Sequence, residues 1–157
     1  MQTDFFEVFR QRVDGKRVLL LGVGNRLRGD DGLGSLLIER LTGKLNIPMI
    51  DASDVPENYL GPIEAARADL VLVLDAADLR ASPGNLALLE LDQLDGTTVS
   101  THTGNLGLLF KVIPSKRRPE VLVLAVQPQS TEFGAGLSYA VRSAMEGIEN
   151  LLLGIFS

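Results

Sequence analysis

The sequence predicts an α/β fold, a three-layer sandwich in which a mostly parallel central sheet of about five strands has helices on both faces. Apolar runs of strand length alternate along the chain with segments whose apolar residues recur at helical spacing. Two of the runs, 70–74 and 121–126, are apolar at every position, as is typical of central parallel strands that are buried on both faces. The 157 residues are expected to form a single domain over 1–157.

The elements of the first half follow from apolar spacing and from turn residues. In chain order they are a helix over 3–14, a strand over 17–23, a helix over 32–43, a strand over 47–50 and a broken helix that ends near 67. Pro48 places its strand at a sheet edge or makes it a strand start. Gly61 and Pro62 interrupt the last of these helices.

The second half alternates in the same way. Its expected elements are a strand over 70–74, a strand over 86–91 after the turn at 82–84, a helix from Leu106 that Pro114 stops, a strand over 121–126 and a helix over 135–153. The last helix has Leu137, Val141 and Ile148 at helical spacing, which predicts one buried face.

Composition excludes several kinds of partner. The net charge is −5 and the largest basic cluster is Lys116-Arg117-Arg118, so we expect neither nucleic acid nor an anionic membrane surface as partner. The chain has no cysteine, which rules out disulfides and thiolate metal sites. The beginning of the sequence lacks the basic-then-apolar order of a signal peptide, and no apolar run approaches the ~20 residues of a membrane helix. We therefore expect a cytoplasmic monomer without membrane insertion.

The chain is organised around the glycine-rich stretch from Gly22 to Gly34. It follows a predicted strand and leads into a helix, so it lies at the carboxyl edge of the sheet, where open α/β sheets bind their ligands. The start of the stretch is similar to a dinucleotide-binding fingerprint, but Leu27 stands in place of the third glycine. In addition, Asp30 and Asp31 would repel a pyrophosphate at the helix start.

Acidic and imidazole side chains follow several of the predicted strands at this edge. One of Asp30 and Asp31 suffices to cap the next helix, which leaves the other unexplained. Asp75 ends the strand over 70–74, and His102 precedes the helix from Leu106. Two carboxylates and one imidazole at one edge suit a divalent ion such as zinc or nickel, with positions left for water or substrate.

A receiver-like phospho-acceptor domain is the main alternative. It also carries an acidic pair after its first strand and an aspartate at the end of its third strand. In this chain Gln127 stands where a receiver needs a lysine to pair with the phosphoryl charge. The metal site is therefore the favoured interpretation, and the alternative of a phospho-acceptor or nucleotide-binding module stays open.

The motifs resemble a known family. The stretch Gly22-Val23-Gly24-Asn25, then Leu27, Asp30-Asp31-Gly32 and Gly34, is similar to the opening motif of the hydrogenase maturation endopeptidases. The resemblance continues in order through Pro56-Glu57-Asn58, Asp75-Ala76-Ala77-Asp78, Pro83-Gly84, Thr101-His102 and Val126-Gln127-Pro128. It looks most like the branch that serves hydrogenase 3 of formate hydrogenlyase.

The resemblance implies a function and a set of site residues. Such enzymes remove a C-terminal extension from the large-subunit precursor of a nickel–iron hydrogenase after nickel insertion. The family's metal-binding and catalytic positions correspond to Asp31, Asp75 and His102. The expected metal is nickel supplied by the precursor, with zinc or another divalent ion as a substitute. Asn25 and Asp30 are expected to orient the loop, and Gln127 to donate to the substrate backbone.

Overall fold

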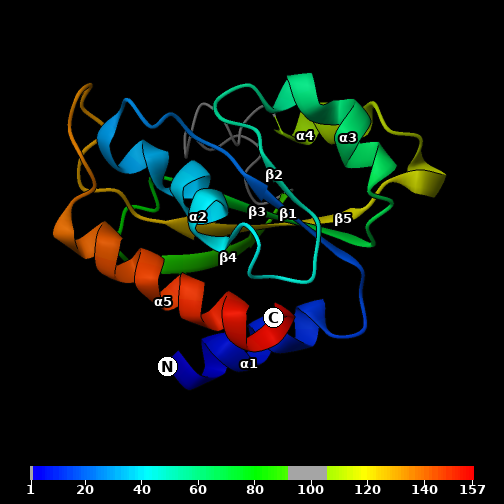
Figure 1. The fold of residues 1–157 in the computed structure, drawn as a ribbon, viewed down its shortest axis with the longest axis horizontal. Helices are drawn as coiled ribbons and strands as arrows, with labels where there is room; N and C mark the ends of the chain where they lie inside the picture. The colour runs from blue at the N-terminus through cyan, green and yellow to red at the C-terminus, as the bar shows by residue number, and fades with distance from the viewer. Residues whose placement is uncertain (1, 92–105) are drawn as a thin grey trace.

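A computed structural model describes residues 2–91 and 106–157, and its centre is a mixed sheet (Figure 1). Over these residues the sheet has five strands in the order β2-β1-β3-β5-β4. They are β1 (Val18–Gly22), β2 (Met49–Asp51), β3 (Leu70–Ala76), β4 (Leu86–Glu90) and β5 (Glu120–Val126). All neighbouring pairs are parallel except β4 with β5, which is antiparallel. The predicted, mostly parallel sheet is confirmed.

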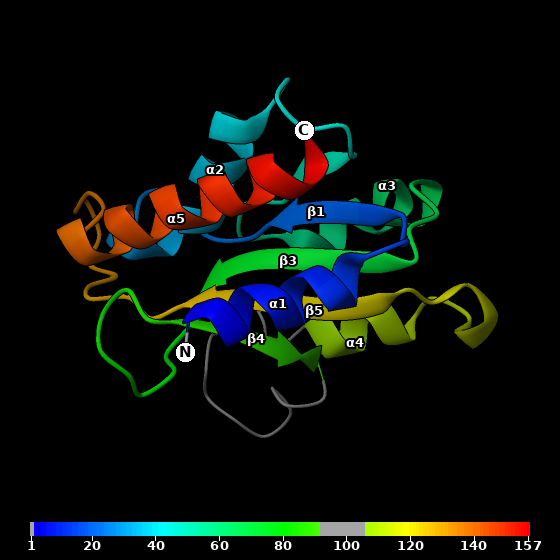
Figure 2. The same cartoon turned by 90° about the horizontal axis from the view of Figure 1, so that it is seen from below.

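Helices cover both faces of the sheet, as the views in Figures 1 and 2 show. One apolar cluster joins the sheet to α1 (Gln2–Val13), α2 (Leu33–Leu41) and α5 (Tyr139–Phe156). A second cluster, on the opposite face, joins it to α3 (Leu60–Ala65) and α4 (Leu106–Lys111). Short 3₁₀ helices complete the description: η1 (Gly29–Gly32), η2 (Pro56–Tyr59) and η5 (Ser115–Arg117). The three-layer sandwich is therefore confirmed.

The sequence of β3 is almost entirely apolar because both faces of this strand are buried. It lies between β1 and β5, and all seven of its residues are buried. Leu70, Leu72 and Leu74 belong to the first cluster, while Val71 and Val73 belong to the second. Because side chains alternate between the faces of a strand, a central strand with helices on both sides needs apolar residues at every position. Asp75 is the exception, and it lies at the carboxyl end of the strand.

The bounds of the last helix and the capping of α2 differ from the sequence prediction. Helix α5 begins at Tyr139 rather than 135 and extends to Phe156. Ser138 is its N-cap, and its hydroxyl accepts the backbone N–H of Val141 at 3.4 Å. The expectation that Asp30 or Asp31 caps α2 is wrong: both lie inside η1, and Gly32 is the N-cap without any side-chain cap. Their carboxylates are used elsewhere.

In the described part of the chain, no helix combines the length and the apolarity needed to cross a membrane.

Candidate active site at the carboxyl edge of the sheet

Two glycines let the start of α2 lie directly on the ends of β1 and β3. A Cβ on Gly34 would lie 2.3 Å from the carbonyl oxygen of Leu74, and one on Gly22 would lie 2.6 Å from the carbonyl oxygen of Gly34. Neither distance leaves room for a side chain, because non-bonded carbon and oxygen atoms stay more than 3 Å apart. The sequence motif thus places the β1–α2 loop against the strand that carries Asp75.

Gly24 lies close to the backbone of Asp31 and to the carboxylate of Asp75. Its φ of +141° is one that residues with a Cβ rarely adopt, and a Cβ there would lie 1.9 Å from the carbonyl oxygen of Asp31 and 3.8 Å from Oδ1 of Asp75. The backbone at Gly24 therefore lies next to both the Asp31 backbone and the Asp75 carboxylate. Both aspartates are buried. The η1 residue Asp31 and the β3 residue Asp75 thus share the carboxyl edge of the sheet.

Asn25 holds the same loop in shape. Its backbone N–H donates to Oδ2 of Asp31 at 2.9 Å, which fixes one oxygen of that carboxylate. Its side-chain Oδ1 accepts the N–H of Leu27 at 2.9 Å, a local turn typical of asparagine. Its Nδ2 lies 3.5 Å from Oδ2 of Asp54. These contacts agree with the predicted orienting role of Asn25.

Asp30 points into the protein and ties down a distant segment. It is fully buried, and its two carboxylate oxygens accept four hydrogen bonds from the residues that follow β5. The donors are the N–H groups of Gln129 at 2.8 Å, Ser130 at 3.2 Å and Ser138 at 2.7 Å, and the Ser138 hydroxyl at 2.9 Å. Such bonds satisfy a buried charge. Asp30 therefore anchors the β1–α2 loop to the segment between β5 and α5.

Gln127 is also bound within the chain. Its Oε1 accepts the N–H of Leu79 at 2.6 Å and that of Ala81 at 3.3 Å. Its Nε2 donates to Oδ1 of Asp78 at 3.4 Å and to the carbonyl oxygen of Pro128 at 3.2 Å. The side chain thus joins the loop after β3 to the end of β5. A bond from Gln127 to substrate backbone stays a prediction.

Arg26 fastens the loop to its neighbours through charge. Its guanidinium lies 2.9 Å from Glu39 of α2 and 3.4 Å from Asp51, the last residue of β2. Asp51 also accepts the Ser35 hydroxyl at 2.7 Å. The sequence pattern did not single out Arg26, Ser35 or Asp51, because each acts on a residue from another element.

The predicted ligand set is described in part. His102 lies outside the described residues. Among residues 2–91 and 106–157, no group of three histidine, cysteine or acidic side chains is placed to hold a metal ion. Asp31 and Asp75 supply two buried carboxylates, and oxygen donors of this kind suit a divalent ion. Metal binding by Asp31, Asp75 and His102 stays a prediction.

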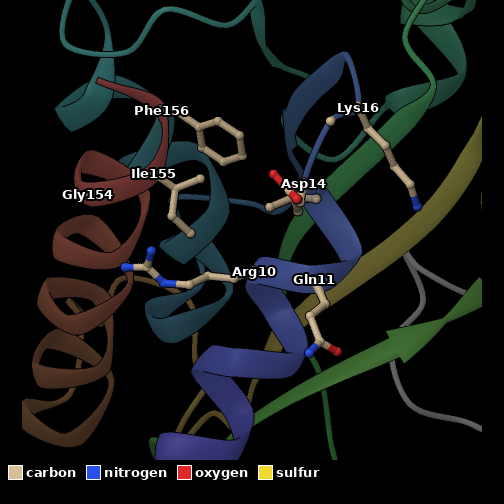
Figure 3. A pocket seen from close by; sticks show the side chains of 9 residues that line it. Arg10, Gln11, Asp14, Lys16, Gly154, Ile155 and Phe156 are labelled. Atoms are coloured by element: carbon tan, nitrogen blue, oxygen red, sulfur yellow. The ribbon is translucent and has the colours of Figure 1, made fainter.

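A pocket of about 530 Å³ lies away from these residues (Figure 3). It is lined by the end of α1, by Gly15 and Lys16 just before β1, and by the last residues of α5 around Phe156. Residues that precede β1 lie at the amino edge of the parallel strands, opposite the candidate site. None of the predicted site residues lines this pocket.

Comparison with known proteins agrees with the resemblance in the sequence. A family model described as hydrogenase maturation protease matches residues 33–155. The hydrogenase 3 maturation protease of Escherichia coli K12 is 32% identical over 139 residues, which are 87% of this chain and 88% of that protein. The fold is similar to the crystal structure of a NiFe hydrogenase maturation protease, HycI, from Thermococcus kodakarensis KOD1, with a TM-score of 0.83. The two chains are 28% identical, and the match covers 94% of this chain and 97% of that one. The chain belongs to the hydrogenase maturation protease family.

Proposed function

We propose that this chain is an endopeptidase that removes the C-terminal extension of a nickel–iron hydrogenase large-subunit precursor once nickel has been inserted. Asp31, Asp75 and His102 complete the coordination of nickel that the precursor already holds. Family membership supports the protease activity. The observation that supports the site is that the Asp31 backbone and the Asp75 carboxylate both lie beside Gly24, and that both aspartates are buried.

His102 is assigned as the third ligand on the resemblance of Thr101-His102 to the family motif. Helix α4 leads through η5 into β5, which starts at the amino edge, so the first residue of α4, Leu106, is its end nearer the carboxyl edge. Helix α4 also contacts η2, which follows the carboxyl end of β2. The helix that follows His102 in the chain therefore begins on the side of the fold that carries Asp31 and Asp75.

The chain's own groups have separate roles in this proposal. The N–H of Asn25 holds one oxygen of Asp31, which fixes the direction of the other. Asp75 is fixed by the close packing of the β1–α2 loop on the end of β3. Together they bind the precursor's nickel and hold the scissile segment beside it. When bound, nickel supplies a positive charge that polarises nearby groups of the precursor.

A site that coordinates the precursor's own nickel selects nickel-loaded precursor over nickel-free precursor. Two carboxylates and one imidazole leave coordination positions open, so a precursor that brings nickel on its own ligands fills them. A precursor without nickel offers no such contact. The same arrangement therefore makes insertion of the metal a condition for cleavage.

The test is to incubate the protein with nickel-loaded and nickel-free precursor and to follow the mass of the large subunit. The proposal predicts shortening of the loaded precursor alone. Shortening of neither form would remove the endopeptidase function, and shortening of both would remove the nickel dependence. His102→Ala is expected to abolish processing while the Tm stays nearly unchanged. A large loss of stability in this variant would instead indicate a structural role for the histidine.

A further inference from the structure

Exposed apolar side chains lie on the two loops beside the candidate site. Leu27, in the β1–α2 loop, is 61% exposed, and Phe133, in the segment between β5 and α5, is 73% exposed. The N–H of Gly134 donates to the carbonyl oxygen of Leu27 at 2.8 Å, so the two loops touch at this point. Figures 1 and 2 show them side by side at one end of the sheet. Tyr139, at the start of α5, is 86% exposed.

Backbone and polar groups hold the loops together here. The N–H of Leu27 donates to Oδ1 of Asn25, and the carbonyl oxygen of Leu27 accepts the N–H of Gly134. The segment with Phe133 is held by the bonds from Gln129, Ser130 and Ser138 to Asp30. A polar side chain at 27 or 133 would leave all these bonds in place. Single exposed apolar residues are ordinary, but a leucine, a phenylalanine and a tyrosine on touching segments are typical of an interface.

We propose that Leu27, Phe133 and Tyr139 form a docking surface for the folded body of the hydrogenase large-subunit precursor. This inference rests on the proposed function. Leu27 precedes Asp31 by four residues in the same loop, so a docking surface at Leu27 adjoins the candidate site. Leucine and aromatic side chains bind best when they are buried against apolar surface. The partner surface is therefore an apolar patch of the precursor next to its extension.

The Asp30 bonds make this surface suitable for binding. They fix the segment after β5 before any partner arrives, so little loop entropy is lost on association. The surface is thus preorganised beside the reactive residues. In this arrangement the docking residues set affinity for the precursor, whereas Asp31, Asp75 and His102 act on the reacting segment.

The test compares Leu27→Ser, Phe133→Ser, Tyr139→Ser and the Leu27→Ser/Phe133→Ser double variant with wild type on nickel-loaded precursor. The double variant is expected to raise KM and the Kd for the precursor about tenfold or more, the effect of losing an interface hot spot. Its kcat at saturating precursor should stay within about twofold of wild type, because no group of the reactive site is removed. Val112→Ser, which removes a 66% exposed valine just after α4, is the matched control and should change neither constant.

Several results would overturn the docking surface. A double variant with wild-type KM and Kd overturns the docking surface and leaves the proposed function intact. A lower kcat at unchanged Kd also overturns it. If wild type does not shorten the loaded precursor, the proposed function fails and the docking proposal with it. If sedimentation shows that the double variant disrupts a dimer of this chain while precursor Kd is unchanged, the surface serves self-association and the proposal is wrong. Equal Tm values for the variants and wild type show that folding is not the cause.

Discussion

Asp30 and Ser138 lie 108 residues apart in the chain and are joined by two hydrogen bonds, from the Ser138 N–H to Oδ1 at 2.7 Å and from its hydroxyl to Oδ2 at 2.9 Å. Ser138 is at the same time the N-cap of α5. One contact therefore fixes the start of the last helix against the loop that carries Asp31. The position of Asp31 depends on this connection, because Asp30 is its neighbour in η1.

Asp30→Ala is expected to lower the free energy of unfolding by at least about 3 kcal/mol, because it leaves several buried donors without their acceptor. Asp30→Asn should cost less, since it keeps one acceptor oxygen. Urea unfolding measures both. Asp54→Ala is the control, because within 2–91 and 106–157 the exposed Asp54 carboxylate accepts only a long 3.5 Å contact from Asn25, and its loss should cost less than about 1 kcal/mol. A loss below about 1 kcal/mol for Asp30→Ala would show that these bonds do not stabilise the fold.

Gly24→Ala is expected to destabilise the protein and to abolish processing. The new methyl group would overlap the carbonyl oxygen of Asp31, and the φ of +141° is unfavourable for alanine. Gly43→Ala separates the two effects, since Gly43 has a φ of +81° with nothing within 4 Å of a Cβ. We expect a loss of about 1 kcal/mol for Gly43→Ala and at least about 3 kcal/mol for Gly24→Ala. Equal losses would mean that the close approach at Gly24 is unimportant.

Gln127 variants distinguish a structural role from a substrate contact. Gln127→Ala frees the N–H groups of Leu79 and Ala81 and should lower the free energy of unfolding by about 1–3 kcal/mol. Gln127→Glu keeps the acceptor for these groups but loses the amide donor. Gln127→Glu also sets a second carboxylate beside Oδ1 of Asp78, so if Gln127 only holds the loop, any loss of processing accompanies a lower Tm. A loss of kcat with an unchanged Tm would instead support donation to the substrate.

The pair Arg40 and Glu149 predicts a pH dependence of stability. Two hydrogen bonds from the Arg40 guanidinium, at 3.0 and 2.9 Å, lower the pKa of Glu149, which joins α5 to α2. The ionised carboxylate is therefore favoured in the folded state, so the pair stabilises above the unfolded pKa and ceases to do so as pH falls through the lower folded pKa.

Glu149→Gln should lower Tm at pH 7 by an amount on the order of 2 °C, and the difference from wild type should vanish in strong acid. Tm measured against pH at low salt tests this. Glu7→Gln, at an exposed position of α1, serves as the control. A difference that persists unchanged in strong acid would contradict the assignment to the charged pair.

The sequence was sufficient for the features that depend on local pattern. The continuous apolar run at 70–74 predicted a central strand, and β3 is that strand. The glycines from Gly22 to Gly34 predicted a tight loop, and the close approaches at Gly24 and Gly34 require it. Because parallel strands end at one edge, Asp31 and Asp75 were expected to lie near each other. The Asp31 backbone and the Asp75 carboxylate both lie close to Gly24, while the joint binding of a metal by the two residues stays a prediction.

What sequence could not predict depends on partners far along the chain. Acidic residues just before a helix often cap it, so the sequence favoured a capping role for Asp30. Its hydrogen-bond partners lie after β5 instead, and no sequence pattern near residue 30 indicates them. Apolar residues at helical spacing from Leu137 onward predict a helix from about 135, whereas Ser138 is the N-cap and the helix begins at Tyr139. A serine before an apolar helix is a common N-cap, which was the available signal for Ser138.

The most direct test of the central claim is the processing of nickel-loaded precursor by Asp75→Asn beside wild type, followed by the intact mass of the large subunit. The substitution keeps the shape of the side chain and removes its charge, so folding should be preserved, as a Tm close to that of wild type would show. The account predicts that wild type removes the extension and that Asp75→Asn leaves the precursor at full length. Cleavage by Asp75→Asn at the wild-type rate would contradict it.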